Sequence, residues 1–204
     1  MMLTKELSTN IKEFYATLVK QHGASVRSLD WGSQQSQYLR FRVLSELDNF
    51  TDASLLDVGC GLADLNAYLD NAGIATHYNG VDLCSEMIEQ ARQEHPNINL
   101  QVCDILADKK LSNFDYVVAS GIFARLGDAP FETMQSIVAR MYELANKGVA
   151  FNLLSIFANY QEEDEYYANP AEVLEYCLSI CSFVTIRHDY LPHDFTVYMR
   201  REPS

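Results

Sequence analysis

The sequence lacks the features that mark membrane and secreted proteins. No apolar run approaches the roughly 20 residues that span a bilayer, and the first stretch, MMLTKELSTNIKEFY, has no apolar core of a signal peptide. The five cysteines include no CxxC pair and no set with zinc-site spacing. We therefore expect a cytoplasmic protein that binds no metal and enters no membrane.

Basic residues are also scarce. Fifteen Lys and Arg stand against 28 Asp and Glu, which gives a formal net charge of −13. Such a field repels phosphate backbones, so we expect no nucleic-acid substrate unless a local basic patch exists, and a small-molecule substrate is favoured. The chain of 204 residues, 48% of them hydrophobic, is long enough for one domain with a substantial core.

Hydrophobic patterning divides the chain near residue 50. Before it, apolar residues follow helical spacing, and we expect residues 1–50 to form an N-terminal helical cap. After it, strands alternate with helices, so we expect residues 51–204 to form one α/β domain with a parallel sheet covered on both faces. The expected strands of the parallel part lie near residues 55–58, 77–83, 98–103, 114–120 and 149–154.

The end of the chain is different in kind. Two strands, near residues 183–187 and 195–200, are joined only by the short segment HDYLPHD. This connection is too short for the crossover that parallel strands need, so the last strand must run antiparallel. The sequence thus predicts an α/β fold with a doubly wound, mostly parallel, seven-stranded sheet that finishes in an antiparallel hairpin.

The stretch LLDVGCGLADLNAYL, residues 55–69, runs from a strand through a turn into a helix. The turn consists of Gly59, Cys60 and Gly61. Its glycines permit a sharp bend and close approach of a ligand to the backbone. A dinucleotide fingerprint would have a third glycine where Asp64 stands, and this carboxylate would repel a pyrophosphate. Asp57 suits a ligand that carries an ammonium group; the alternative is a purely structural turn.

Two more acids end neighbouring strands. Asp82, followed by Leu83, is placed to accept hydrogen bonds from both hydroxyls of a ribose. Asp104, followed by Ile105, is placed to accept one from the amino group of an adenine. The alternative for Asp82 is to cap the following helix, which Ser85 could do instead. Three acids at the ends of three consecutive strands, beside one glycine turn, together indicate a nucleoside site.

Four stretches carry a resemblance to a known family: LDVGCGLADL, GVDLCSEMIEQAR, VCDIL and FDYVVASGIF. With them, residues 33–200 resemble the class I S-adenosylmethionine-dependent methyltransferases. The resemblance implies S-adenosylmethionine as cofactor and a Rossmann-like sheet with an antiparallel end. It also implies that the glycine turn holds the methionine and ribose portions, that the second-strand acid binds the ribose, and that the third-strand acid contacts adenine.

Carried over residue by residue, these roles fall on Asp57, Gly59, Gly61, Asp82 and Asp104, to which we add the neighbours Cys60, Leu83, Ile105 and Ser120. Ala63 stands where the family usually has a third small residue. In such enzymes an arginine on the helix before the first strand often reaches the methionine carboxylate. Arg40 would suit this role, with Gln37 one turn earlier as the alternative and a solvated helix face as another.

The methyl acceptor is expected beyond the carboxyl ends of the strands. His188 and His193, in HDYLPHD, are the candidates for a catalytic general base because imidazole titrates near neutrality, although either could be an exposed turn residue. The stretch FANYQEEDEYYANP is long enough to form a lid. The N-terminal helices, with Tyr15 and Trp31, are expected to form a cover.

We therefore predict an S-adenosylmethionine-dependent methyltransferase that acts on an O or N nucleophile of a small molecule. Two alternatives remain open: an NAD-dependent oxidoreductase, against which Asp64 argues, and a non-catalytic S-adenosylmethionine-binding protein. Polyamine synthases share the fold but need an acidic segment after the fourth strand, where this chain has SGIF. The sequence gives no preference for an oligomeric state.

Overall fold

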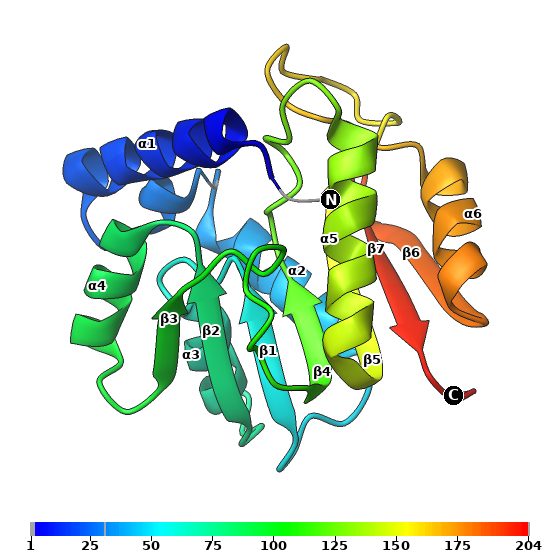
Figure 1. Cartoon of the computed structure of the whole chain (residues 1–204), viewed down its shortest axis with the longest axis horizontal. Helices are drawn as coiled ribbons and strands as arrows, with labels where there is room; N and C mark the ends of the chain where they lie inside the picture. The colour runs from blue at the N-terminus through cyan, green and yellow to red at the C-terminus, as the bar shows by residue number, and fades with distance from the viewer. Residues whose placement is uncertain (1–2, 31, 204) are drawn as a thin grey trace.

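The computed structural model describes residues 3–30 and 32–203. The strands in these ranges form one seven-stranded sheet, in the order β3-β2-β1-β4-β5-β7-β6 (Figure 1). They are β1 (Ser54–Val58), β2 (His77–Asp82), β3 (Asn99–Val102), β4 (Phe114–Ala119), β5 (Ala145–Leu154), β6 (Phe183–Leu191) and β7 (Asp194–Arg200). The first five strands are parallel, whereas β7 runs antiparallel to both β5 and β6. The predicted fold class is confirmed.

Helices cover both faces of the sheet. One core cluster joins α2 (Gln34–Ser45), α3 (Asp64–Asn71) and α4 (Ser85–Glu94) to one face, and another joins α5 (Pro130–Leu144) and α6 (Pro170–Ile180) to the other. Leu55 and its neighbour Leu56 belong to different clusters, because successive side chains of a strand point to opposite faces. The order of the sheet reverses between β1 and β4, which opens a crevice at their carboxyl ends.

The N-terminal elements are α1 (Lys5–His22), the 3₁₀ helix η1 (Val26–Leu29) and α2. Trp31 lies outside the described residues. The Oγ atom of Ser33 caps α2 by accepting a hydrogen bond from Ser36 N at 3.2 Å. Phe41 and Leu44 of α2 share a core cluster with β1, so α2 packs on the sheet directly. The division into a cap at 1–50 and a domain at 51–204 stays a prediction.

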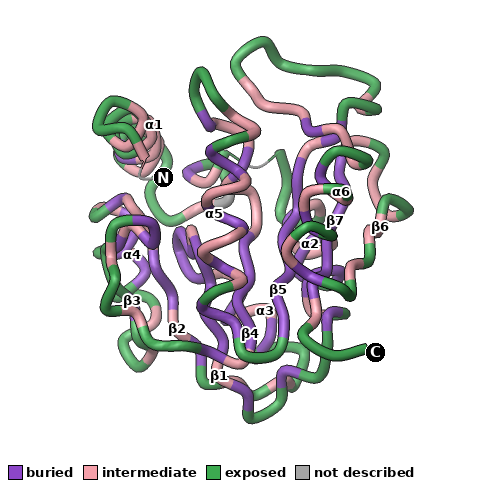
Figure 2. Tube along the Cα trace, turned by 45° about the vertical axis from the view of Figure 1, so that its right-hand side comes forward, coloured by how far each residue is buried: buried purple, intermediate pink, exposed green. Residues whose placement is uncertain are grey.

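α1 differs from the other helices in how little of it is buried. Ala16 alone among its residues is buried, and the tube in Figure 2 is mostly exposed or intermediate along this helix. In Figure 1, α1 lies above the carboxyl ends of the strands. It therefore covers that edge of the sheet, and its Ala16 packs in a small core cluster with Leu62, Cys84 and Met87. Within the described ranges, no helix has the length and apolar character needed to cross a membrane.

The C-terminal hairpin is longer than the sequence pattern indicated. β6 continues to Leu191 and β7 begins at Asp194, so the connection is the pair Pro192 and His193 rather than the whole segment HDYLPHD. The extension arises because Asp194 pairs with Leu191 on β6 and with Leu154 on β5. His188 consequently lies in a strand, which matters for its predicted catalytic role.

Candidate active site

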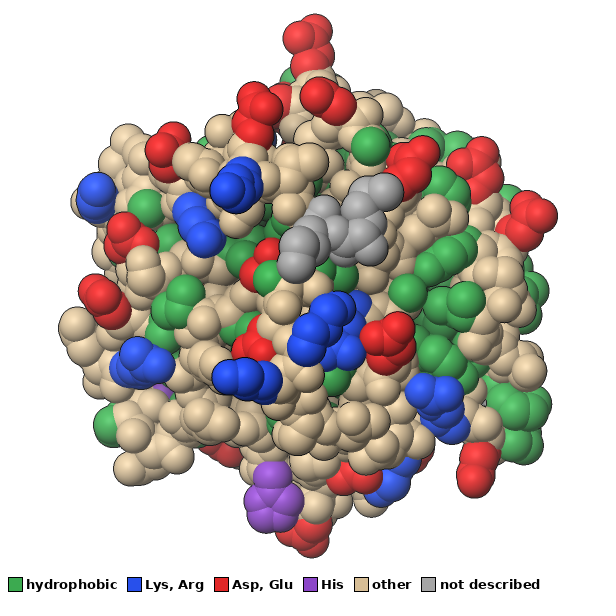
Figure 3. Space-filling view, viewed as in Figure 1, with side chains coloured by type: hydrophobic (Ala, Val, Ile, Leu, Met, Phe, Trp, Pro, Cys, Tyr) green, Lys and Arg blue, Asp and Glu red, His purple; other side chains and the backbone are tan. Residues whose placement is uncertain are grey.

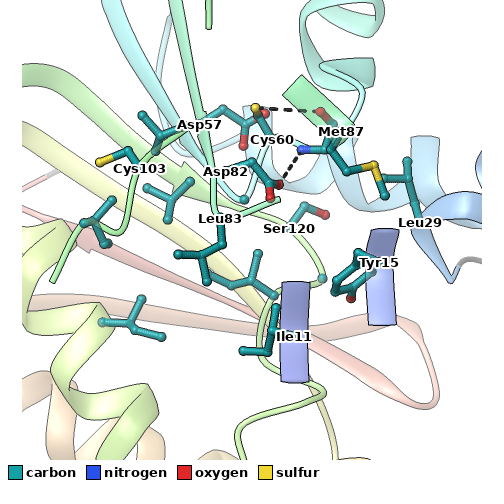
Figure 4. Close-up of a pocket in the computed structure, with 18 of the residues that line it drawn as sticks. Ile11, Tyr15, Leu29, Asp57, Cys60, Asp82, Leu83, Met87, Cys103 and Ser120 are labelled. Carbon is teal, nitrogen blue, oxygen red and sulfur yellow. Dashed lines mark hydrogen bonds between the residues drawn. The ribbon is translucent and has the colours of Figure 1, made fainter. Parts of the chain in front are cut away.

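A first cavity lies beyond the carboxyl ends of β1, β2 and β4 and contains about 1140 Å³ of empty space, its open mouth included. It brings together most of the residues predicted to bind the cofactor: Asp57, Gly59, Cys60, Gly61, Asp82, Leu83, Asp104, Ile105 and Ser120. Figure 4 shows Ile11 and Tyr15 reaching this cavity from α1, on the side that faces Asp82, Leu83 and Ser120.

The turn between β1 and α3 requires glycine at both positions. Gly59 and Gly61 have φ values of +71° and +53°, in the left-handed region. A Cβ atom at Gly59 would lie 2.2 Å from Cγ2 of Ile122, and one at Gly61 would lie 2.4 Å from Cδ2 of Leu29. Ala63 also has a positive φ, of 63°. The small residue expected there is thus part of the same left-handed turn.

Asp82 ties this turn to the next βα unit. Its Oδ2 atom accepts a hydrogen bond from Gly61 N at 2.9 Å, and its Oδ1 atom accepts one from Cys84 N at 2.8 Å. Burial raises the pKa of Asp82. Ser85 does not cap α4, since its hydroxyl instead donates to Glu86. Because each carboxylate oxygen has two lone pairs, Asp82 can hold both amides and still face a ligand.

Other carboxyl groups line the same cavity. Asp57 is buried and accepts a hydrogen bond from the Tyr78 hydroxyl at 2.6 Å; its burial raises the pKa of this carboxyl to about 7. Asp64 accepts one from Gln37 Nε2 at 2.9 Å. The Oδ1 atom of Asp104 accepts one from Leu106 N at 2.9 Å. Such a lining suits hydroxyl, amino and ammonium groups and disfavours a pyrophosphate.

Arg40 does not reach the first cavity. Its side chain is 5% exposed, forms an ion pair with Asp194 and donates a hydrogen bond to Ser36 O at 3.2 Å. The charge of Arg40 is therefore directed to the start of β7. Gln37, one turn earlier on α2, does line the first cavity. Of the two residues considered for the cofactor's carboxylate, the structure brings only Gln37 to this cavity.

A second cavity adjoins the first, with about 1890 Å³ of empty space, open mouth included. It lies among α1, the start of α2, the loop after β4, the loop between β5 and α6, and the turn between β6 and β7. Its acidic residues are Asp30, Glu162, Asp164, Glu165 and Asp194. In Figure 3, acidic side chains protrude along the upper edge, where the loop between β5 and α6 lies in Figure 1.

The two predicted catalytic histidines are separated by the structure. His193 lines the second cavity, with its Nε2 atom 3.9 Å from Oδ2 of Asp194. His188 lines neither cavity. It projects from β6 with its ring 6.2 Å from that of Phe157 and 6.0 Å from that of Phe195. Of the two predicted catalytic residues, the structure thus places only His193 at one of these cavities, and the catalytic role of either histidine stays a prediction.

Some residues of the first cavity were not predicted from the sequence as ligand contacts. They include Leu3, Ile11, Leu29 and Met87. Ile11 belongs to the apolar stripe of α1, which by its spacing predicts burial against a core, and Leu3 precedes this helix. The stripe was the available signal, but the sequence could not reveal that it faces a cavity.

Comparison with known proteins supports a family assignment. Residues 55–148 match the family described as "Methyltransferase domain". Rv1506c of Mycobacterium tuberculosis, named as a methyltransferase, is 33% identical over 170 residues, which are 78% of this chain and 98% of that protein. The chain belongs to the class I S-adenosylmethionine-dependent methyltransferases, as the resemblance implied, and is an enzyme that uses this cofactor. The alternative of an NAD-dependent oxidoreductase is thereby set aside.

Solved structures show the same fold. Magnesium protoporphyrin IX methyltransferase of Synechocystis PCC 6803, with bound S-adenosylhomocysteine, has a TM-score of 0.71 at 13% identity, covering 96% of this chain and 100% of that one. The N-methyltransferase NodS of Bradyrhizobium japonicum WM9, in complex with the same compound, has a TM-score of 0.67 at 16% identity, covering 92% of this chain and 97% of that one. At these identities the likeness is one of fold.

The glycine turn gives a first prediction. We expect Gly59→Ala to lower the free energy of unfolding by more than the roughly 1 kcal/mol of a left-handed alanine, because its Cβ also meets Ile122, and to weaken S-adenosylhomocysteine binding by about 10-fold. Gly73→Ala is the matched control, since Gly73 has φ +74° and nothing within 4 Å of an added Cβ. Urea unfolding and calorimetry measure both effects; unchanged affinity in Gly59→Ala would contradict the prediction.

The raised pKa of Asp57 gives a second prediction. Between about pH 4 and pH 7, Asp57 keeps its proton in the folded protein and has lost it in the unfolded chain. The free energy of unfolding of the wild type therefore falls as pH rises through this range. Asp57→Asn keeps the shape but does not titrate. The free energy of unfolding of Asp57→Asn, relative to the wild type, should therefore rise by a few kcal/mol between pH 4 and pH 8.

Urea unfolding at both pH values, without cofactor, tests this dependence. The other acidic groups are common to the two proteins, so their titration cancels in the difference. A difference that stays constant between pH 4 and pH 8 would show that Asp57 ionises normally in the folded protein.

Proposed function

We propose that this enzyme transfers the methyl group of S-adenosylmethionine to an O or N nucleophile of a small molecule held in the second cavity. One observation carries the proposal: the two cavities meet at a shared boundary, which is lined by Tyr15, Leu29, Gly121 and Arg125. A donor in one cavity and an acceptor in the other would face each other across this boundary. Holding two reactants in such proximity is the main task in a direct displacement.

The residues of the first cavity fit the cofactor's chemical groups. When bound, S-adenosylmethionine supplies a methyl group activated by its sulfonium charge. Asp82 would accept hydrogen bonds from the ribose hydroxyls, and Asp104 one from the adenine amino group, with Ile105 against the ring. Gly59 and Gly61 let Ile122 and Leu29 pack against the turn at the wall of this cavity. Asp57 would attract the ammonium of the methionine portion.

A small molecule is the acceptor class that the charges favour. The net charge of −13 repels nucleic acids, and five acidic residues line the second cavity. Its two arginines are already engaged: Arg40 with Asp194, and Arg125 with Asp30 and Asp164. Five acids against two arginines leave the cavity with an excess of negative charge, which disfavours a polyanion and favours an uncharged or cationic acceptor.

A base is needed only when the attacking atom carries a proton at the working pH. His193 is the titratable group best placed for this task, because it lines the second cavity and neighbours the carboxylate of Asp194. We assign the proton-accepting role to His193 and no role to His188.

Asp82→Ala tests the cofactor site. Losing a charge-assisted contact should weaken S-adenosylhomocysteine binding about 10-fold or more, measured by calorimetry. Asp128→Ala removes the same charge from an exposed position outside both cavities and should bind as the wild type does. Thermal unfolding of each variant, without ligand, checks that the fold is retained. Equal affinities of Asp82→Ala and the wild type would remove Asp82 from the site.

Turnover tests the reaction itself. The wild type should release S-adenosylhomocysteine from S-adenosylmethionine when given a panel of small phenols, carboxylic acids and amines. Tight cofactor binding with no turnover on any member would show that the acceptor is not a small molecule of these classes.

The two histidines give a paired prediction. His193→Gln should lower turnover about 100-fold for an acceptor that must lose a proton, and the loss should be smaller at high pH, where the acceptor ionises unaided. His188→Gln should retain wild-type turnover, because His188 lies outside both cavities. Both variants should bind S-adenosylhomocysteine normally. A larger loss in His188→Gln than in His193→Gln would reverse this assignment.

A further inference from the structure

The boundary between the two cavities contains few groups able to contact an acceptor's reacting atom. Leu29 is apolar, and Gly121 contributes only backbone, with its N–H already donated to Asn152 Oδ1 at 2.9 Å. Both terminal nitrogens of Arg125 are engaged, with Asp30 at 3.0 Å and with Asp164 at 2.5 Å. The remaining shared residue is Tyr15, and no described residue hydrogen-bonds its hydroxyl.

We propose that the Tyr15 hydroxyl is a catalytic group that hydrogen-bonds the attacking atom of the acceptor and holds it toward the transferred methyl. This inference rests on the proposed function and extends it to a residue of the N-terminal helix. Figure 4 shows the Tyr15 ring at the edge of the first cavity, beside Ile11.

The chemistry of a neutral phenol fits this role. Burial, together with the charge of Asp30, raises the pKa of Tyr15, so the hydroxyl stays protonated at physiological pH and is not a base. Its oxygen can accept a hydrogen bond from one N–H of an amine nucleophile, whose other hydrogen remains for His193 to accept as a proton. The nucleophile's lone pair is then left free to attack the methyl group. The Nε–H of Arg125 is buried at the same boundary, but as a donor it would occupy that lone pair.

Arg125 acts as the positioning residue for Tyr15. Its guanidinium carbon lies 4.0 Å from the ring centroid of Phe14, the residue before Tyr15, and the Phe14 and Tyr15 rings pack edge to face at 5.1 Å. This cation–π contact adds to the packing of Ala16 against Leu62, Cys84 and Met87 in holding the helix over the site. Through Asp30 and Asp164, Arg125 also joins two other segments of the second cavity.

Two cofactor analogues test the role of Tyr15 without a known acceptor. S-adenosylhomocysteine has no group in place of the methyl, whereas sinefungin carries a primary ammonium on the carbon that replaces the sulfonium. In the wild type this ammonium should donate a hydrogen bond to Tyr15. We expect Tyr15→Phe to bind sinefungin about 10-fold more weakly and S-adenosylhomocysteine within about 2-fold of the wild type, both measured by calorimetry.

The control is Tyr38→Phe, a tyrosine of α2 that lines neither cavity; it should bind both analogues normally. Arg125→Gln, introduced into the wild type, should lower the ratio of the affinity for sinefungin to that for S-adenosylhomocysteine. Introduced into Tyr15→Phe, it should leave this ratio unchanged, because its effect passes through Tyr15. A purely structural role of Arg125 would instead weaken both analogues equally.

The outcomes separate the two proposals. If the wild type binds neither analogue, the proposed function and this inference fail together. If the wild type binds both and Tyr15→Phe retains the full affinity for sinefungin, the proposed function stands and the inference is wrong. Retained S-adenosylhomocysteine binding in Tyr15→Phe also reports that the variant is folded.

Discussion

The pair of hydrogen bonds made by the Asp82 carboxylate is the constraint on which the active site depends. One bond fixes the amide of Gly61 in the first βα unit, and the other fixes the amide of Cys84 in the second. Asp82 is the last residue of β2 and lies beside the crevice where the sheet order reverses. These hydrogen bonds therefore fix the backbone that lines the first cavity. The helix-capping interpretation and the ligand-binding interpretation of this residue are therefore compatible: the hydrogen bonds that shape the turn also fix the carboxylate at the first cavity, where we propose that it binds the ribose.

The two cavities are built from different kinds of structure. The first is formed mainly by strand ends and the turns that follow them, held by the buried sheet. The second is formed by loops and by α1, which buries a single residue. Local free energies of opening are lowest where burial is slight. The chain thus combines a rigid cavity, which we propose for the cofactor, with a looser one, which we propose for the acceptor.

Much of this arrangement could be predicted from the sequence, because strand alternation and the order of elements determine where strand ends meet. Asp57 and Asp82 lie at or next to the ends of β1 and β2, and Asp104 follows β3 by two residues. The parallel topology brings all three to one edge of the sheet. The partner of Arg40 could not be foreseen, since Asp194 is distant in the chain and no local pattern links them. The same holds for His188, which lies in the irregular stretch of β6 between Arg187 and Leu191; no local pattern of the sequence indicates this irregularity.

The ion pair between Arg40 and Asp194 explains why the second cavity has a defined shape despite its loops. Both side chains are about 95% buried, and a buried pair gains little net stability after desolvation. Burial raises the pKa of Asp194 even beside the guanidinium, so the carboxylate is held by this one cation rather than by solvent. Removing either partner would leave a buried charge, so the pair ties α2 to the first residue of β7. It thereby holds His193 at the wall of the second cavity, while Arg125 holds Tyr15 at its boundary with the first.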